Sequence, residues 1–335
     1  MSVPALRLVH MGRRLAFGVD LGGTNVRVVL GDERGNILAR LMERTETRRG
    51  PLGVSRQIVR MIRSIRVEGL KLGEVEGVGI GSAGPLDLKR GGLMKPTNIP
   101  YEFVPLVEPI EEELGLKTYL LNDCSTAVMG ERFFGAGKGV ENLAYITIST
   151  GIGGGVYVDG KLLIGKDGNA TEIGHFTIDY EGHLLCGCGK RGHWEAYCSG
   201  NGIPNYVDLI LRDKSRNEVE LSLLSMMRER EGGRISAKSL YESAKAGDSL
   251  ALEIVDRIGR LNAIGFACVN DAYDPSLITV GGSVALNNRS LVIEPIRRYI
   301  GEHTRNRVPE IRITPLGGDV VLYGALAMVF NRFSP

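Results

Sequence analysis

Two stretches of the chain share one pattern, and this repetition constrains the fold more than any other feature. Residues 15–40 (LAFGVDLGGTNVRVVLGDERGNILAR) and 143–165 (LAYITISTGIGGGVYVDGKLLIG) each read as an apolar strand, a glycine- and threonine-rich turn, a second strand, a tight turn and a third strand. Elsewhere helical periodicity predominates, for example at 53–65, 103–114, 236–246 and 250–269. The duplicated hairpin predicts two copies of one α/β domain that face each other. Coincidence is the alternative, because hairpins with glycine turns are common.

Length and composition fit a protein of two compact domains. The chain has 335 residues, of which 43% are hydrophobic and 24% charged, as in ordinary soluble globular proteins. The net charge of +2, without long runs of one sign, argues against a nucleic-acid-binding surface. No apolar stretch approaches the roughly 20 residues that cross a bilayer, and the start of the chain lacks the apolar core of a signal peptide. We therefore expect a cytoplasmic protein without a nucleic-acid or membrane partner.

A glycine fingerprint points to a different fold, which we reject. Gly79, Gly81 and Gly84 follow a predicted strand at 75–80 with the spacing of a dinucleotide-binding turn. Such a turn has to open a helix, but the following PLDLKRGG reads as a loop. The sequence therefore does not predict a dinucleotide-binding domain.

Three glycine turns, each after a predicted strand, suit the binding of a nucleotide. Glycines let backbone N–H groups approach phosphate oxygens because no Cβ stands in the way. The first turn follows a carboxylate, which would repel phosphate unless a divalent cation lay between them, so we expect Mg²⁺ there. Any one loop could be a plain tight turn, but three in this order are a more specific signal. The predicted contacts are Asp20, Gly22, Gly23, Thr24 and Asn25 in the first turn, Thr150 and Gly151 in the second, and Gly281 and Gly282 in the third.

Five motifs read together resemble one known family. DLGGTN, LNDCSTAVMGE, STGIGGG, TEIGH and CGCGKRGHWE occur in this order, and they are similar to the motifs of the ROK family of sugar kinases and sugar-responsive repressors. The resemblance implies an α/β fold with two ribonuclease-H-like domains of the actin-like ATPase superfamily around a cleft. It implies a small domain of residues 1–120 plus a C-terminal helix at 320–335, and a large domain of residues 121–319. ATP would lie across the cleft, with its adenosine near Gly281 and Gly282.

Asp123 lies where a predicted strand at 118–121 meets a predicted helix. A neutral hydroxyl is a poor nucleophile, so phosphoryl transfer to a sugar needs a proton acceptor, and this carboxylate has no Lys or Arg beside it in the sequence. The local residues fit an Asp that caps the helix equally well. The resemblance implies the catalytic role, because the family's base matches Asp123 and a ligand of a sugar hydroxyl matches Asn122.

Two glutamates have unusual neighbours. A carboxylate can accept hydrogen bonds from two sugar hydroxyls at once, which suits an uncharged polyol. A solvated surface position is the alternative for each, although Glu195 stands between Trp194 and Ala196. By resemblance, the sugar ring is contacted by Glu172, His175 and Glu195 from one domain and by Gly84 and Asn98 from the facing domain.

The stretch CGCGKRGHWEAYCSG at 186–200 concentrates cysteine, histidine and glycine. With an upstream histidine it gives the spacing H-x10-C-x-C-x4-H, and four nitrogen and sulfur ligands suit a closed tetrahedral zinc site. The four candidate ligands are His175, Cys186, Cys188 and His193. ROK proteins carry zinc on one histidine and three cysteines, so His193 here replaces the third cysteine. A disulfide or a metal-free loop is the alternative, Cys198 and His183 are spare candidates, and we interpret Cys124 and Cys268 as small buried residues.

The resemblance implies ATP- and Mg²⁺-dependent transfer of the γ-phosphoryl group to the 6-hydroxyl of glucose, or of several hexoses. A kinase for an N-acetylated hexosamine is the nearest alternative, because it shares the ring contacts. A sugar-responsive repressor carries an N-terminal helix-turn-helix, for which we expect no room before the first strand. A chaperone-like ATPase would not need the set of Glu172, His175 and Glu195. The expected partners are a hexose and ATP, and a homo-oligomer is one option for the assembly.

Overall fold

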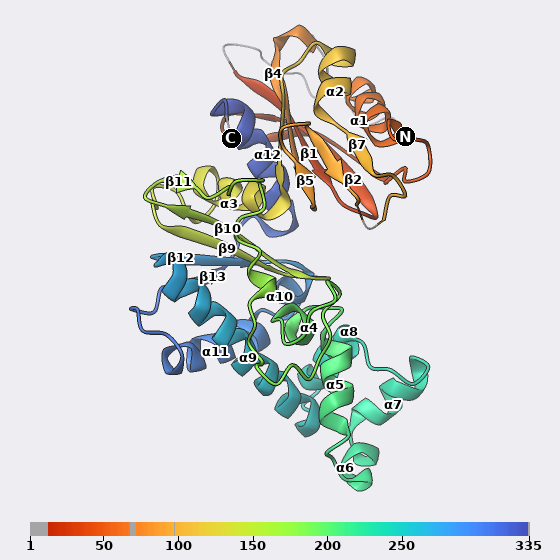
Figure 1. The fold of residues 1–335 in the computed structure, drawn as a ribbon, viewed down its shortest axis with the longest axis vertical. Helices are drawn as coiled ribbons and strands as arrows, with labels where there is room; N and C mark the ends of the chain where they lie inside the picture. The colour runs from red at the N-terminus through yellow and green to blue at the C-terminus, as the bar shows by residue number, and fades with distance from the viewer. Residues whose placement is uncertain (1–12, 68–71, 97, 334–335) are drawn as a thin grey trace.

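The structure is a computed structural model that describes residues 13–67, 72–96 and 98–333 (Figure 1). The first half of the chain builds a five-stranded sheet in the order β3-β2-β1-β4-β8. The first three strands form an antiparallel meander, and β4 and β8 extend the sheet in parallel with β1. The strands are β1 (Leu15–Leu21), β2 (Asn25–Asp32), β3 (Ile37–Arg44), β4 (Val75–Ser82) and β8 (Thr118–Asn122).

The second half repeats this sheet in the order β11-β10-β9-β12-β13. Again the first three strands form an antiparallel meander, and the last two are parallel to the first. The strands are β9 (Leu143–Ile148), β10 (Ile152–Val158), β11 (Lys161–Leu162), β12 (Leu277–Gly281) and β13 (Glu310–Ile313). Because the two sheets agree in strand order and direction, the predicted duplication of one α/β unit is confirmed.

A small three-stranded sheet is inserted between β4 and β8, in the order β5-β6-β7. Its strands are β5 (Leu86–Asp87), β6 (Gly92–Met94) and β7 (Phe103–Pro105). The chain therefore leaves β4 into a loop and a short strand, as expected from the rejection of a dinucleotide-binding turn. The helix predicted at 103–114 is wrong in its first turn, because residues 103–105 pair with β6 and the helix begins only at Val107.

Helices cover both faces of the first sheet. Leu15, Phe17 and Val19 of β1 point to the apolar core shared with α1 and α2, whereas Ala16 packs against α12 on the other face. This alternation is the two-residue period of a strand that is buried on both sides. The helices are α1 (Gly53–Ser64), α2 (Val107–Leu114) and α12 (Val320–Phe330). The first twelve residues of the predicted small domain and residues 334–335 of the predicted C-terminal helix lie outside the described residues.

The second half carries most of the helices, on the side of its sheet remote from the first half (Figure 1). The predicted helices at 236–246 and 250–269 are α8 and α9. The helices are α4 (Glu195–Cys198), α5 (Ile203–Leu211), α6 (Arg216–Leu221), α7 (Leu223–Arg230), α8 (Ala237–Lys245), α9 (Ser249–Tyr273), α10 (Ser283–Asn287) and α11 (Arg289–Tyr299). Short 3₁₀ turns occur at Leu72–Glu74, Ile173–His175, Ile300–Glu302 and Gly317–Asp319. In the described ranges, no helix combines the length and apolar character that crossing a membrane requires.

The two halves meet at α3 (Asp123–Phe133) and α12, which pack against each other (Figure 1). The contact is made by backbone, because a Cβ built at Gly324 of α12 would lie 1.7 Å from the carbonyl oxygen of Thr126 in α3. A Cβ at Gly79 of β4 would lie 1.9 Å from the carbonyl oxygen of Ala325 on the opposite side. Helix α12 is thus enclosed by the sheet and by α3, which explains why its sequence is apolar all round.

We predict that Gly324→Ala destabilises the fold, because its methyl group would overlap the Thr126 carbonyl and force α3 and α12 apart. Overpacking of this kind lowers the free energy of unfolding by about 1–3 kcal/mol. Gly301→Ala is the control, since no atom lies within 4 Å of a Cβ built there, and it should change stability by less than about 0.5 kcal/mol. Chemical denaturation measures the free energy of unfolding of both variants. Equal stability of Gly324→Ala and the parent would contradict the backbone contact.

Candidate functional site

The predicted acids gather at one edge of the first sheet. β1, β4 and β8 are parallel and in register, so that Leu21 lies beside Ser82, and Ser82 beside Asn122. Their carboxyl ends therefore bring Asp20, the loop that contains Gly84, and the Asn122–Asp123 pair to the same edge. Partial burial raises the pKa of Asp123, and the nearby carboxylates of Asp20 and Glu172 raise it further. The edge is thus an acidic site with residues from both halves.

Asn122, rather than Asp123, is the N-cap of α3. The Asn122 Oδ1 atom accepts hydrogen bonds from the backbone nitrogens of Cys124, at 2.9 Å, and Ser125, at 3.4 Å. Asp123 Oδ1 also accepts from the Cys124 nitrogen at 2.8 Å, whereas its Oδ2 has no hydrogen bond among the described residues. Because the capping position is filled by its neighbour, Asp123 retains an oxygen that can take a proton.

The first glycine turn connects β1 to β2, and two hydrogen bonds within the protein stabilise it. The backbone nitrogen of Gly22 donates to the carbonyl oxygen of Asn25 at 2.9 Å, and the Thr45 hydroxyl donates to the carbonyl oxygen of Gly22 at 2.7 Å. Gly23, Thr24 and Asn25 are exposed or nearly so. A Cβ built at Gly23 would lie only 2.3 Å from Nδ2 of Asn98. The structure therefore brings a predicted sugar contact, Asn98, against the predicted phosphate turn.

Asp20 belongs to a chain of alternating charges that the sequence analysis missed. Nε of Arg27 donates to Oδ2 of Asp20 at 2.9 Å, and Nη1 of Arg27 donates to Oδ1 of Asp319 at 3.0 Å. Arg40 donates to the other oxygen of Asp319 at 2.6 Å. Burial raises the pKa of Asp20, and Arg27 opposes the shift. The chain ties the first turn to the start of α12.

Only part of this network had a signal in the sequence. Asp20 and Arg27 are directly opposite each other in the β1–β2 hairpin, so an alignment of the two predicted strands across the turn would have paired them. Asp319 is almost three hundred residues from Arg27, and only the folding of α12 against the first sheet brings it there.

The second and third glycine turns border a pocket of about 470 Å³. The hydroxyl oxygens of Ser149 and Ser283 lie 3.1 Å apart and join the two turns. The wall of the pocket is completed by α8 and α10 and includes Lys238, Tyr241 and Glu242, which the sequence analysis did not single out. Larger hollows of about 750 and 700 Å³ lie beside α1 and α2, on the first half and away from the glycine turns. Size alone therefore does not identify the site.

The predicted pair Gly281 and Gly282 ends β12 and leads into α10 at the edge of this pocket. Gly282 has a φ of 86°, a backbone conformation that favours glycine. A Cβ there would lie 2.4 Å from the carbonyl oxygen of Ile148. Glycine at this position thus allows the third turn to pack directly against the end of β9.

The three residues predicted to contact the sugar from the second half lie close together. Nε2 of His175 is 3.8 Å from Oε2 of Glu172. Glu195 begins α4, and its Oε2 accepts a hydrogen bond from the backbone nitrogen of Ile152 at 2.9 Å. Partial burial raises the pKa of Glu172; His175 opposes the shift, and the Glu195 carboxylate adds to it. The carboxylates are therefore close enough to interact, although the Glu172 side chain is 54% exposed, as the surface alternative expects, and that of Glu195 is partly buried.

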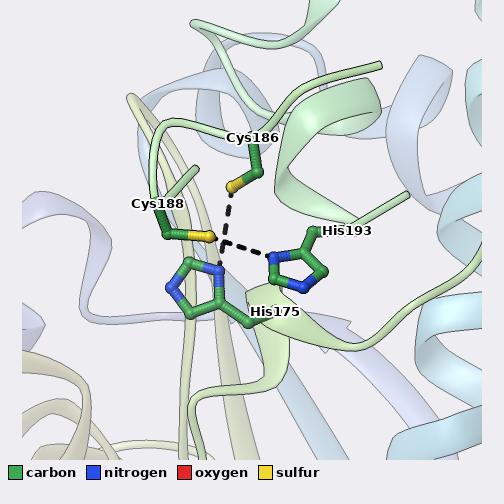
Figure 2. A group of neighbouring side chains, drawn as sticks. All are labelled: His175, Cys186, Cys188 and His193. Atoms are coloured by element: carbon green, nitrogen blue, oxygen red, sulfur yellow. Dashed lines mark hydrogen bonds between the residues drawn. The ribbon is translucent and has the colours of Figure 1, made fainter. Parts of the chain in front are cut away.

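The four candidate metal ligands converge, as Figure 2 shows. One ligand atom from each of His175, Cys186, Cys188 and His193 lies within 4.8 Å of the others. Sγ of Cys186 is 3.8 Å from Nδ1 of His175, and Sγ of Cys188 is 3.2 Å from Nδ1 of His193. Two ligands of a tetrahedral zinc ion should be about 3.5 Å apart, given Zn–S and Zn–N bonds near 2.3 and 2.0 Å. The donor set and its spacing therefore fit zinc.

The two spare candidates lie outside this cluster. Sγ of Cys198 is fully buried and donates to the carbonyl oxygen of Ile258 at 3.7 Å. Nδ1 of His183 lies 3.0 Å from Oδ2 of Asp179 instead. All five cysteines are free thiols, and the structure contains no disulfide among the described residues. Cys124 is buried as predicted, but the prediction for Cys268 is wrong, because this side chain at the helix surface of α9 is only partly buried.

Comparison with known proteins gives a consistent result. The sequence model described as the ROK family matches residues 16–332. A glucokinase of Pyrobaculum calidifontis is 35% identical over 94% of each chain, and a glucokinase of Aeropyrum pernix is 37% identical over 94% of this chain and 96% of its own. The crystal structure of a ROK family glucokinase from Streptomyces griseus in complex with glucose and AMPPNP superposes with a TM-score of 0.76, at 33% identity over 95% of this chain and 99% of its own.

Proposed function

Because the chain belongs to the ROK family, we propose that it is an ATP-dependent glucokinase with the two-domain, actin-like ATPase fold. It transfers the γ-phosphoryl group of ATP to the 6-hydroxyl of glucose, and the products are glucose 6-phosphate and ADP. The similar glucokinases and the complex with glucose and AMPPNP support this activity. The observation that carries it is the acidic sheet edge, where Asp123 lies close enough to Asp20 of the first turn and to Glu172 for both carboxylates to raise its pKa.

The site lies between two domains in this proposal. The small domain comprises residues 1–120 with the C-terminal helix 320–335, and the large domain comprises residues 121–319. The duplicated sheets and the packing of α12 on the first sheet support this division. Closure of the domains on the sugar would exclude water and so limit hydrolysis of ATP. Since ATP is a cytoplasmic nucleotide, the proposal keeps the expected cytoplasmic location.

Asp123 is the general base. Its free Oδ2 accepts the proton of the 6-hydroxyl as the oxygen attacks the γ-phosphorus. Burial and the neighbouring carboxylates raise the pKa of this carboxyl, which makes it a better proton acceptor than an ordinary aspartate. Asn122 donates its amide to a neighbouring sugar hydroxyl, since its oxygen is already engaged in capping α3.

The sugar ring is held by polar groups from both domains. Glu172 and Glu195 accept hydrogen bonds from ring hydroxyls, and His175 contributes its free ring nitrogen. Gly84 and Asn98 approach from the small domain. The proximity of Asn98 to the first glycine turn supports this arrangement, because it puts the sugar beside the phosphate to be transferred.

The nucleotide lies along the three glycine turns. Backbone and side-chain donors of Gly23, Thr24 and Asn25 face the phosphates, as do those of Thr150 and Gly151. Gly22 shapes the first turn, since its own N–H is bonded to the Asn25 carbonyl oxygen. The adenosine lies near Gly281 and Gly282 in the pocket bordered by α8. Asp20 would hold Mg²⁺ through the oxygen that Arg27 leaves free. When bound, this ion would neutralise phosphate charge; one protein carboxylate suffices, because Mg²⁺ keeps several waters.

Zinc on His175, Cys186, Cys188 and His193 is structural in this proposal. It closes the loop at residues 175–193 and takes no part in phosphoryl transfer. His175 would bind zinc through Nδ1, which faces Cys186, and leave Nε2 for the sugar. Glu195 follows His193 by two residues, so the ion would also fix the start of α4.

We expect purified protein with Mg-ATP to phosphorylate glucose at the 6-hydroxyl. A coupled assay that also includes mannose, fructose, glucosamine and N-acetylhexosamines measures the specificity. If kcat/KM is highest for an N-acetylhexosamine, that class of sugar, and not glucose, is the preferred substrate. If no hexose 6-phosphate forms from any of these sugars, the kinase proposal is wrong.

Replacing the proposed base should slow phosphoryl transfer and leave glucose affinity largely unchanged. Asp123→Asn keeps the shape but cannot take the proton, so kcat should fall by about 10²–10⁴. Glucose affinity, measured by calorimetry, should change far less. In the parent enzyme, kcat should decline on the acid side at a pH above the ordinary aspartate value of 3.8, since Asp123 must be ionised and its folded pKa is raised. Near-normal kcat in Asp123→Asn would rule out this role.

Metal analysis tests the zinc site. The parent should contain one zinc per chain, and Cys186→Ser should lose it, together with glucose affinity and thermal stability. Cys198→Ser is the matched control, because Cys198 is a nearby thiol that lies outside the cluster, and it should keep the metal. His193→Cys should keep it too. Well under one zinc per chain, with full activity after chelation, would contradict the proposal.

A further inference from the structure

We propose that Glu195 is a positioning residue for the second glycine turn, so that one carboxylate serves the sugar side and the nucleotide side of the site. The inference rests on the proposed function for the identity of the two ligands. Its basis, however, is a contact within the protein. Among the residues predicted to touch the sugar, Glu195 is the one whose carboxylate bonds to the backbone of a nucleotide turn.

The contact is direct and close. Oε2 of Glu195 accepts the backbone N–H of Ile152 at 2.9 Å, and Ile152 is buried. A Cβ built at Gly151 would lie 2.4 Å from the same oxygen, so the turn lies immediately against the carboxylate. A hydrogen bond between an ionised acceptor and a buried N–H is stronger than a neutral one. Oε1 lies 3.7 Å from Sγ of Cys186 and so faces the metal cluster.

The segment after Glu195 holds the other end of the same turn. The backbone nitrogen of Gly200 donates to the carbonyl oxygen of Ser149 at 2.7 Å, and that of Asn201 donates to the carbonyl oxygen of Thr150 at 3.2 Å. Ser149, Thr150, Gly200 and Asn201 all line the pocket proposed for the nucleotide. Helix α4 thus begins at the sugar side and leads into the nucleotide side, and its first residue and the residues just after it are bonded to the turn.

Helix α4 is itself firmly anchored, which makes it a suitable support. Trp194, which immediately precedes it, is fully buried and donates its indole N–H to Oδ1 of Asn262 in α9 at 2.8 Å. Ala196, Tyr197 and Cys198 are buried as well. A carboxylate at the start of such an element has a fixed direction, so its loss should free the turn rather than move the helix.

Glu172 provides a matched comparison. It is the other carboxylate proposed to bind the sugar, and its Oε2 lies 3.8 Å from Nε2 of His175. Within the part of the chain that the structure describes, it has no hydrogen bond to a glycine turn. Loss of either glutamate should weaken glucose binding, but only loss of Glu195 should weaken nucleotide binding in the absence of sugar.

Calorimetric titration of the full-length protein with ADP and Mg²⁺, without sugar, tests the inference. Glu195→Ala should weaken ADP binding about tenfold, the scale expected for a lost hydrogen bond to a charged group. Glu172→Ala should stay within twofold of the parent. An unchanged ADP affinity in Glu195→Ala overturns the inference, and so does an equal loss in both variants, which would indicate general damage to the site.

Hydrogen exchange gives a second readout that does not depend on any ligand. The amide of Ile152 should exchange at least tenfold faster in Glu195→Ala than in the parent or in Glu172→Ala, and unchanged exchange overturns the proposal. If Glu195→Ala does not fold, Glu195→Gln replaces it: its neutral amide oxygen is a weaker acceptor, so faster exchange at Ile152 is still expected. Titration with glucose separates this inference from the proposed sugar site. Normal glucose affinity in both Glu172→Ala and Glu195→Ala would contradict the proposed sugar contacts, but not the positioning role of Glu195.

Discussion

The packing of α3 against α12 is the contact on which the rest of the structure depends. These helices approach until backbone touches backbone, at Gly324 and Thr126, and α12 lies equally close to the first sheet at Gly79. Neither approach leaves room for a Cβ. Since α3 begins at Asp123 and also packs on β9 and β10 of the second sheet, this contact fixes where the proposed base lies relative to both halves.

Electrostatics at the junction follows from this geometry. Asp20, Asp123 and Glu172 come from three separate segments, and Asp20 and Glu172 both raise the pKa of Asp123. Arg27 lies on the other side of Asp20 and links it to Asp319 at the start of α12. Arg27 opposes the rise in the pKa of Asp20, whereas the carboxylates around Asp123 add to the effect of burial. Acids of one residue type can thus serve different purposes at one sheet edge, because their partners differ.

The thirty residues from Glu172 to Asn201 carry three sets of contacts that matter for the proposed site. It carries the proposed sugar contacts, the convergent cluster of two histidines and two cysteines, and the bonds that hold the turn between β9 and β10. Apart from its 3₁₀ turn and the short helix α4 it has little regular structure, so its shape depends on side-chain contacts and on the ion that the cluster would bind.

The sequence by itself determined the duplicated sheet, the main helices and the composition of the candidate metal cluster, because these depend on periodicity and on spacing within short segments. Strand alternation and glycine turns recur in both copies, and the four cluster residues fall within nineteen positions, so a local reading could find them. Only the tertiary structure decided that Asn122 caps α3, that residues 103–105 form a strand, and that Cys198 lies away from the cluster. It also brought Asp319 to Arg27, α8 to the pocket proposed for the nucleotide and Glu195 to Ile152. Those contacts join segments that are distant in the chain, and their partners are chosen by how the sheets and helices pack, which no periodicity within one segment records.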